Sequence, residues 1–405
     1  MRTGPLENPS YEFFRRELCN ECGSCLHGCP VLGLSLEEAK EEIKRLIEGK
    51  ETEHVSTKCI SCMTCSLLCP KGCDPYQLIL SRWNERYKRE GLPLRVKMVL
   101  PLESPNFLSI AKESMPEDER KTLRAWSEAS KSKEKVAGAK EVMYAGCNAQ
   151  IFPYLTHTKL LEGLTVIGEQ ELCCGEVYYR MGLLEQVNRI AHRVGKRLNS
   201  LGLKKVITFC PACYDMFKNV YPKFGVQLDF EIQDLREWLW ERIEDGRIEI
   251  RSRVDKTVTI QDSCHARLMG DPFLDLPRKI LKAVGAEIIE MERDRRRALC
   301  CGIADGVSRY DPFDMVNGAR RQWEKAEKTG ADVLVVYCAT CLLMLSIGQM
   351  AGPTNMPVYH ILEILRLATG EEPIRRHSKR AEDIVRGLWE GTAFSDGRFW
   401  IETRA

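Results

Sequence analysis

The sequence lacks an excess of charge, an uninterrupted hydrophobic segment and a glycine-rich nucleotide motif. Its 405 residues hold 60 Lys and Arg against 58 Asp and Glu, a net charge of +2. This balance argues against nucleic acid as the main partner, because phosphate binding usually leaves a basic excess. The longest apolar stretch, 333–352, contains cysteines and polar residues and predicts a buried strand followed by a helix. Neither G-x-G-x-x-G nor G-x-x-x-x-G-K-[ST] occurs, so we do not expect these motifs to hold a flavin or nicotinamide here.

The sequence also has no charged and apolar leader before Cys19, which predicts a cytoplasmic protein. Attachment to the inner face of the membrane through a partner is an alternative. Cysteine, by contrast, is abundant, with 19 residues in a chain too long to need disulfide staples. In a reducing compartment, clustered cysteines indicate metal or redox chemistry.

The cysteines form three groups, with nine in residues 19–73, five in 147–213 and five in 264–341. The last two groups are an internal repeat in which a single cysteine is followed by Cys-Cys-Gly and then by C-x-x-C. From the Cys-Cys pair to the C-x-x-C the spacing is 36 residues in one copy and 37 in the other. Apolar runs alternate with helical patterns in both copies, which predicts two α/β units with parallel strands, related by a pseudo-twofold axis.

The first group contains two copies of C-x2-C-x2-C-x3-C-P, the spacing used for [4Fe–4S] cubanes. In this motif three thiolates hold one cluster and the fourth ligates the other. One predicted set is therefore Cys19, Cys22, Cys25 and Cys69, and the other is Cys59, Cys62, Cys65 and Cys29. Zinc is the alternative, but it favours paired C-x-x-C steps. Cys73 is left over and is interpreted as a small buried apolar residue.

Each repeat supplies five thiolates, one more than a cubane or a tetrahedral zinc can take. A Cys-Cys pair indicates two neighbouring irons. Gly175 and Gly302 follow the pairs and predict a positive φ that lets backbone N–H groups approach sulfur. At the carboxyl ends of parallel strands, such a site is expected to be exposed in a crevice.

The doubled Cys…Cys-Cys-Gly…C-x-x-C behind two cubane motifs resembles the catalytic subunits of CoB–CoM heterodisulfide reductases, either of the D type or of a type that fuses the C and B polypeptides. The resemblance covers about residues 15–370. It implies a noncubane [4Fe–4S] cluster on each complete repeat, beside the two cubane [4Fe–4S] clusters. The implied ligands, also the implied catalytic cysteines, are Cys147, Cys173, Cys174, Cys210 and Cys213 in one repeat and Cys264, Cys300, Cys301, Cys338 and Cys341 in the other.

His265 follows Cys264, where the family tends to place histidine, and is a candidate proton donor to a leaving thiolate. The alternative is a hydrogen-bonded or solvent-facing histidine, and its counterpart Asn148 cannot titrate. The implied substrate carries anionic groups, so Arg180, Arg267 and the run 293–297 are candidate contacts, although a solvated turn is the other interpretation of the run.

The predicted fold class is multidomain α plus α/β: a helical twin-[4Fe–4S] ferredoxin-like domain followed by two cysteine-rich α/β units. The predicted ranges are 1–91 for the helical domain, 92–139 for a linker with short helices, 140–250 and 251–370 for the two units, and 371–405 for a tail. Ser35 and Glu38 predict a capping box before a helix of about four turns. The charged tail contains Trp389, Phe394, Phe399 and Trp400, which suit either a docking strap or a mobile terminus.

The resemblance implies an oxidoreductase subunit that reduces a small-molecule disulfide, the CoB–CoM heterodisulfide foremost, at the two noncubane clusters fed by the cubanes. Two one-electron centres facing each other would share one S–S bond. The electrons would come from another subunit, either a membrane b-type cytochrome or a flavin-containing bifurcating subunit, in a hetero-oligomer. The rival function is electron relay to a quinone-linked, acyl-CoA or sulfur-metabolising partner without a disulfide substrate.

Overall fold

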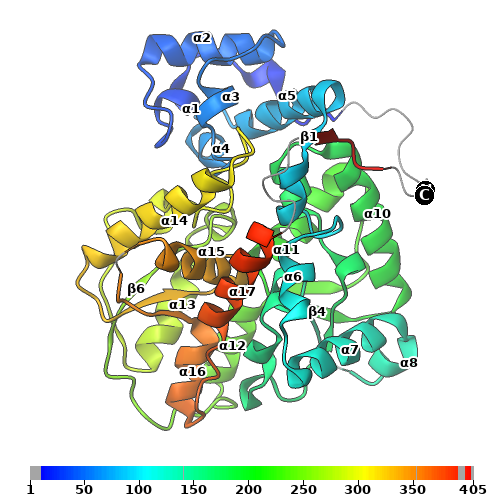
Figure 1. The fold of residues 1–405 in the computed structure, drawn as a ribbon, viewed down its shortest axis with the longest axis vertical. Helices are drawn as coiled ribbons and strands as arrows, with labels where there is room; N and C mark the ends of the chain where they lie inside the picture. The colour runs from blue at the N-terminus through cyan, green and yellow to red at the C-terminus, as the bar shows by residue number, and fades with distance from the viewer. Residues whose placement is uncertain (1–10, 140, 353, 391–396, 403–405) are drawn as a thin grey trace.

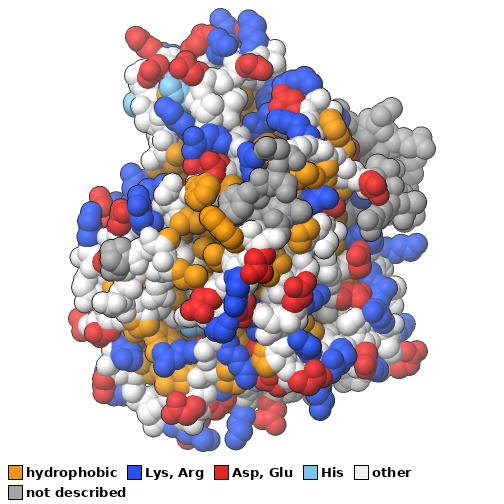
Figure 2. Space-filling view, viewed as in Figure 1, with side chains coloured by type: hydrophobic (Ala, Val, Ile, Leu, Met, Phe, Trp, Pro, Cys, Tyr) orange, Lys and Arg blue, Asp and Glu red, His pale blue; other side chains and the backbone are white. Residues whose placement is uncertain are grey.

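The computed structural model describes residues 11–139, 141–352, 354–390 and 397–402. A helical region lies at one end of the molecule, and two units that each contain a parallel sheet lie side by side against it (Figure 1). Within the described residues no helix is long and apolar enough to cross a membrane. Acidic and basic side chains are interspersed over the face shown in Figure 2, in keeping with the small net charge.

Short helices joined by cysteine-containing loops make up the N-terminal region. Helix α2 begins after Ser35, whose hydroxyl accepts from the Glu38 N–H while Glu38 accepts from the Ser35 N–H, so the predicted capping box is present. This helix has 12 residues, somewhat fewer than four turns. The elements are η1 (Arg16–Leu18), α1 (Ser24–His27), α2 (Leu36–Ile47), α3 (Val55–Lys58), α4 (Thr64–Leu68) and α5 (Pro75–Glu90).

The connecting segment is helical, as predicted, although one of its helices, α7, has 15 residues and is not short. Its elements are β1 (Leu92–Pro93), η2 (Leu94–Val99), α6 (Phe107–Glu113), α7 (Glu117–Lys131) and α8 (Lys133–Val136).

The first unit contains a four-stranded parallel sheet in the order β3-β2-β4-β5. Its strands are β2 (Val142–Tyr144), β3 (Thr165–Ile167), β4 (Lys205–Thr208) and β5 (Glu231–Asp234). Its helical elements are η3 (Asn148–Ile151), η4 (Pro153–Thr156), η5 (Lys159–Leu161), η6 (Gln170–Leu172), α9 (Glu176–Arg180), α10 (Leu184–Ser200), α11 (Pro211–Asp215), η7 (Met216–Val220), η8 (Tyr221–Phe224) and α12 (Leu235–Glu244).

The second unit has the same order, β7-β6-β8-β9, and is also parallel throughout. Its strands are β6 (Thr257–Ile260), β7 (Glu287–Ile288), β8 (Val333–Val336) and β9 (Val358–His360). Its helical elements are η9 (Ala266–Met269), α13 (Asp271–Ala283), η10 (Arg295–Arg297), α14 (Pro312–Glu327), α15 (Ala339–Met350) and α16 (Ile361–Thr369). The apolar stretch 333–352 is thus the buried strand β8 followed by α15, as predicted.

The described part of the tail docks on the same chain. Helix α17 (His377–Glu390) packs against α6 and α15, and strand β10 (Arg398–Phe399) pairs with β1. The ring of Trp400 lies against Gly91, where an added Cβ would come within 2.9 Å of it. The strap interpretation therefore holds for these elements, while Phe394 lies outside the described residues.

Candidate functional site

The repeat cysteines lie at the carboxyl ends of the two central strands of each sheet. Cys147 and Cys210 follow β2 and β4, and Cys264 and Cys338 follow β6 and β8. In the first sheet the chain runs from β2 outward to β3 and then returns to β4 on the other side of β2, and the second sheet does the same with β6, β7 and β8. The direction of strand addition therefore reverses between the two central strands of each sheet. Parallel α/β sheets form their sites at such a reversal, because the loops there diverge to opposite faces.

The thiols of each repeat contact one another in an unbroken series. In the first unit the series is Cys147, Cys173, Cys174, Cys213 and Cys210, and in the second it is Cys264, Cys300, Cys301, Cys341 and Cys338. The sulfur atoms of Cys210 and Cys338 lie 3.7 Å apart and join the two series. All ten implied ligands therefore meet at one place between the units.

All ten of these side chains are buried. The expectation that the repeat cysteines lie exposed in a crevice is therefore wrong. The two units and the N-terminal region cover the ends of the strands that carry them. A hydrogen bond with Cys173 and burial hold the pKa of Cys147 well above its usual range. A hydrogen bond with Cys300 and burial do the same to the pKa of Cys264. Thiols gathered this closely need a bound cation to become thiolates together.

The N-terminal cysteines gather in two neighbourhoods. Burial, together with the thiols of Cys69, Cys19 and Cys22, raises the pKa of Cys25 to about 12. Burial also raises the pKa of Cys65 well above its usual range, and the nearby thiols of Cys59, Cys62, Cys25 and Cys29 contribute in that order. Cys69 thus lies near thiols of the first motif and Cys29 near thiols of the second, and the two ligand sets remain a prediction.

Cys73 is buried and lies beside the first of these sets. Its backbone N–H donates to the Cys69 sulfur at 3.4 Å, and its thiol contacts Cys69 and Cys19. Cys73 is therefore placed to hydrogen-bond to a ligand, a role that the spacing did not reveal.

The thiol sets fit a group with several metal atoms better than a single ion. Sets of four and five clustered thiols with backbone N–H groups aimed at sulfur are the donors that iron–sulfur clusters use. The N–H of Gly175, for example, lies 3.4 Å from the Cys173 sulfur.

The two glycines after the Cys-Cys pairs have the predicted positive φ, +84° at Gly175 and +111° at Gly302. A Cβ at Gly175 would meet the Ile190 side chain at 3.1 Å. A Cβ at Gly302 would lie 2.5 Å from the carbonyl oxygen of Met315, in the backbone of α14. The second glycine thus permits a closer approach of helix to loop.

His265 is buried in a charged network that crosses between the units. Its Nδ1 lies 2.8 Å from Asp215 Oδ2, and its Nε2 lies 2.7 Å from Glu176 Oε1 and 2.9 Å from Arg180 Nη2. Burial alone would lower the pKa of His265, but the two carboxylates outweigh it and raise the pKa to about 10. This environment matches the hydrogen-bonded alternative, and proton supply remains a prediction. Sequence reasoning missed Asp215 and Glu176, although each lies within two residues of a repeat motif.

Two of the candidate arginines join the N-terminal region to the repeats. Arg180 donates to the Ser61 carbonyl at 2.8 Å and to the Cys264 sulfur at 3.2 Å. Arg267 donates to the Cys62 carbonyl at 2.5 Å and to the Thr64 hydroxyl at 3.0 Å. Both guanidinium groups are therefore engaged within the protein and fix the loop 59–65 against the repeat thiols.

The run 293–297 is mostly a surface turn. Arg296 and Arg297 are exposed and pair with Asp271 and Asp294. Arg293 differs, because it lines a cavity between the N-terminal region and the second unit.

Comparisons with known proteins agree with this arrangement. Residues 12–70 match the 4Fe-4S dicluster domain, and residues 142–218 and 258–346 each match the cysteine-rich domain called CCG. The D-type subunit of a dihydromethanophenazine:CoB–CoM heterodisulfide reductase from Methanosarcina mazei is 26% identical over 87% of this chain and 94% of its own length. The B-type subunit of a fumarate reductase (CoM/CoB) from Methanothermobacter marburgensis is 26% identical over 87% and 72%. An EtfAB:quinone oxidoreductase from Syntrophomonas wolfei is 28% identical over 49% of this chain and 29% of its own length.

Proposed function

The chain is an iron–sulfur oxidoreductase related to the D-type subunits of heterodisulfide reductases, and from this premise we propose that it reduces a disulfide, the CoB–CoM heterodisulfide foremost. The observation that carries the proposal is the 3.7 Å contact between Cys210 and Cys338, which joins two five-thiol sets into one site. A disulfide has two sulfur atoms, and a site built from two five-thiol sets suits them.

The proposed ligands are the cysteines of the four sets described above, with cubane clusters on the N-terminal sets and noncubane clusters on the repeats. When bound, such clusters accept and release electrons one at a time. The protein holds the sets in a fixed order. Arg180 and Arg267 tie the loop 59–65 to the repeat thiols, whereas Cys19, Cys22 and Cys69 of the other N-terminal set are partly exposed.

This order supports electron entry at the N-terminal region from another polypeptide. We propose a hetero-oligomer whose electron donor is a flavin-containing protein or a b-type cytochrome. The relatives named as reductase subunits support an assembly of this kind.

One observation favours the rival function, electron relay without a disulfide substrate. All ten repeat thiols are buried, and a relay needs no opening for a substrate. The name of the quinone oxidoreductase relative agrees with a relay of this kind.

A single assay separates the two functions. The protein is purified anaerobically, its iron is counted, with about 16 atoms expected for four four-iron clusters, and oxidation of reduced methyl viologen is followed after adding the heterodisulfide. Turnover that is lost in Cys210→Ser supports reduction at the joined thiols. Full iron without turnover contradicts it and leaves the relay. Ser200→Ala, at an exposed residue at the end of α10, is the control and is expected to keep its iron and its turnover.

A further inference from the structure

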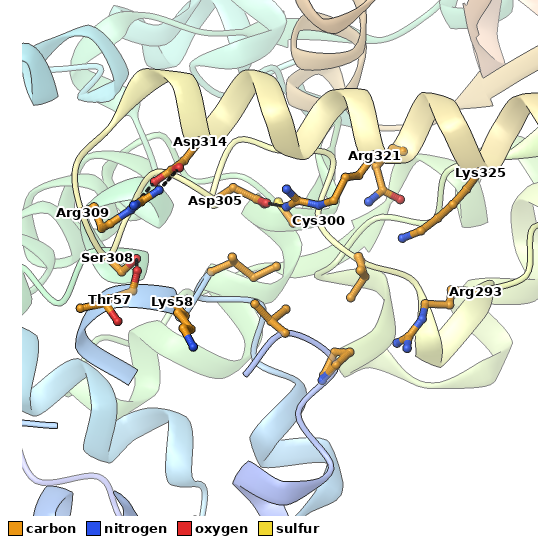
Figure 3. Close-up of a pocket in the computed structure, with 15 residues that line it drawn as sticks. Thr57, Lys58, Arg293, Cys300, Asp305, Ser308, Arg309, Asp314, Arg321 and Lys325 are labelled. Carbon is orange, nitrogen blue, oxygen red and sulfur yellow. Dashed lines mark hydrogen bonds and ion pairs between the residues drawn. The ribbon is translucent and has the colours of Figure 1, made fainter. Parts of the chain in front are cut away.

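A cavity of about 650 Å³ separates the N-terminal region from the second unit. One wall is formed by Pro30, Val31, Thr57, Lys58 and Ile60, which are neighbours in sequence of Cys29 and Cys59. Thr57 and Lys58 are labelled on this wall in Figure 3. The loop after β7 and helix α14 form the other, and Cys300 is the one repeat cysteine that lines it. The cavity therefore reaches a thiol of the second repeat and none of the first.

The cavity is rich in positive charge. Five cationic side chains line it, against the two carboxyl groups of Asp305 and Asp314; they are Lys58, Arg293, Arg309, Arg321 and Lys325. Asp314 pairs with Arg309 and Asp305 with Arg321. Within the described ranges neither Arg293 nor Lys325 has an ion-pair partner.

Three of these cationic side chains lie together, two of them without an ion-pair partner among the described residues. Arg293, Arg321 and Lys325 line the same end of the cavity in Figure 3, with Arg321 and Lys325 one turn apart on α14. Burial lowers the pKa of Lys325, and the repulsion from Arg293 and Arg321 adds to this effect. A bound anion would relieve that repulsion.

A buried polar atom without a partner lies beside them. Asp305 is 5% exposed, and its Oδ1 has no hydrogen-bond partner among the described residues. Burial raises the pKa of Asp305 to about 7 despite the pairing with Arg321. The carboxyl group can therefore become a neutral donor toward an anion. Gly318 permits this placement, since a Cβ there would lie 2.6 Å from the carboxyl group.

We propose that this cavity binds the anionic end of the disulfide substrate, a sulfonate, phosphate or carboxylate group, between Arg293, Arg321 and Lys325, with its sulfur-bearing part directed toward Cys300. The proposal rests on the disulfide reduction proposed above and assigns the residues that hold an anionic group of that substrate. In this proposal the substrate approaches the joined thiols from the second unit. Because planar guanidinium groups and an ammonium bind tetrahedral and planar anions alike, the three anionic groups share one chemistry.

The first test measures anion binding directly. Inorganic sulfate is titrated calorimetrically into the anaerobic protein with its iron in place, for the unaltered chain, Arg293→Gln/Lys325→Gln and Arg320→Gln. Arg320 is the matched control, because it lies on α14 but is 55% exposed and pairs with Glu324. The double variant is expected to weaken sulfate binding at least tenfold and the control less than twofold. Equal binding by all three proteins, or no binding by any, overturns the anion site.

The second test separates a free anion from the substrate. Bis(2-sulfonatoethyl) disulfide and the neutral bis(2-hydroxyethyl) disulfide have similar size, and KM is measured for both with reduced viologen. The double variant is expected to raise KM for the sulfonate at least tenfold and to leave the neutral disulfide unchanged. An equal effect on both disulfides overturns the substrate assignment.

The two tests also distinguish this inference from the function on which it rests. If no disulfide is turned over by the unaltered protein, disulfide reduction and the substrate assignment both fail, and sulfate binding alone decides whether the cavity is an anion site. If disulfides are turned over but sulfate binding is unaffected by the variants, the reduction stands and the cavity proposal fails. Should the double variant lose iron, the single variants Arg293→Gln and Lys325→Gln replace it, since both side chains are partly exposed.

Discussion

The two cysteine-rich units have the same strand order and the same order of cysteines, yet the residues around the thiols differ. The residue after the first cysteine reaches across to the other unit in both. Asn148 of the first unit donates to the Thr340 hydroxyl of the second at 2.6 Å, a single neutral contact. His265 of the second unit contacts Asp215 and Glu176 of the first, a buried charged network.

This difference teaches that the repeat specifies where the thiols lie but not which side chains surround them. The charged network and the cavity at Cys300 both belong to the second unit, which makes the site unequal between its halves.

The largest effect on both units is expected from removing one proposed cluster ligand from each. Cys147→Ser and Cys264→Ser are each expected to lose the iron of their own repeat, about four of about 16 atoms, and to abolish disulfide turnover. Iron analysis and viologen oxidation measure both effects. Retained turnover in Cys147→Ser alone would contradict a shared reaction and assign it to the second unit.

The next largest effect is expected from His265→Asn. This substitution places in the second unit the residue type that the first unit has at the equivalent position, Asn148. Removing one partner from a buried ion-pair network leaves uncompensated charge and costs about 3–5 kcal/mol. The midpoint of anaerobic urea unfolding should fall accordingly. His157→Asn is the control, because that ring is partly exposed and bonds Thr122 in the connecting segment. Similar midpoints for both variants would show that the network adds no stability.

The paired glycines give a smaller, graded effect. Gly302→Ala is expected to destabilise the protein by about 1–3 kcal/mol, since a positive φ is strained for alanine and its Cβ would meet backbone atoms. Gly175→Ala should cost about 1 kcal/mol, because the Ile190 side chain can shift. Thermal unfolding of both variants tests this ranking, and the reverse order would contradict it.

The smallest effect is expected at Asn148. Replacing it with alanine removes one hydrogen bond to Thr340, worth about 0.5–1.5 kcal/mol. The urea midpoint measures the change. A loss as large as that of His265→Asn would mean that the two crossing contacts are equivalent after all.

Much of the architecture was predictable because it depends on local patterns. The capping box at Ser35 and the strand and helix of 333–352 follow from spacing along the chain. The cysteine sets were predictable for the same reason, since C-x2-C-x2-C-x3-C-P and the repeated Cys-Cys-Gly specify both spacing and ligand chemistry.

The contacts across units were not predictable in this way. Arg180 and Arg267 were candidates for substrate contacts because they lie near the cysteines in sequence, but both are engaged with the loop 59–65. The partners of His265 lie 50 and 89 residues away, and no local pattern relates them.

The sequence by itself determined the types of domain, the parallel α/β repeat and the groups of thiols, because helix periodicity, strand runs and ligand spacing are properties of short segments. Only the tertiary structure decided that Cys210 meets Cys338, that the ten repeat thiols are buried and that a basic cavity reaches Cys300. These features depend on how three regions pack against one another. Packing is set by surfaces assembled from residues far apart in the chain, so spacing along the chain cannot specify it.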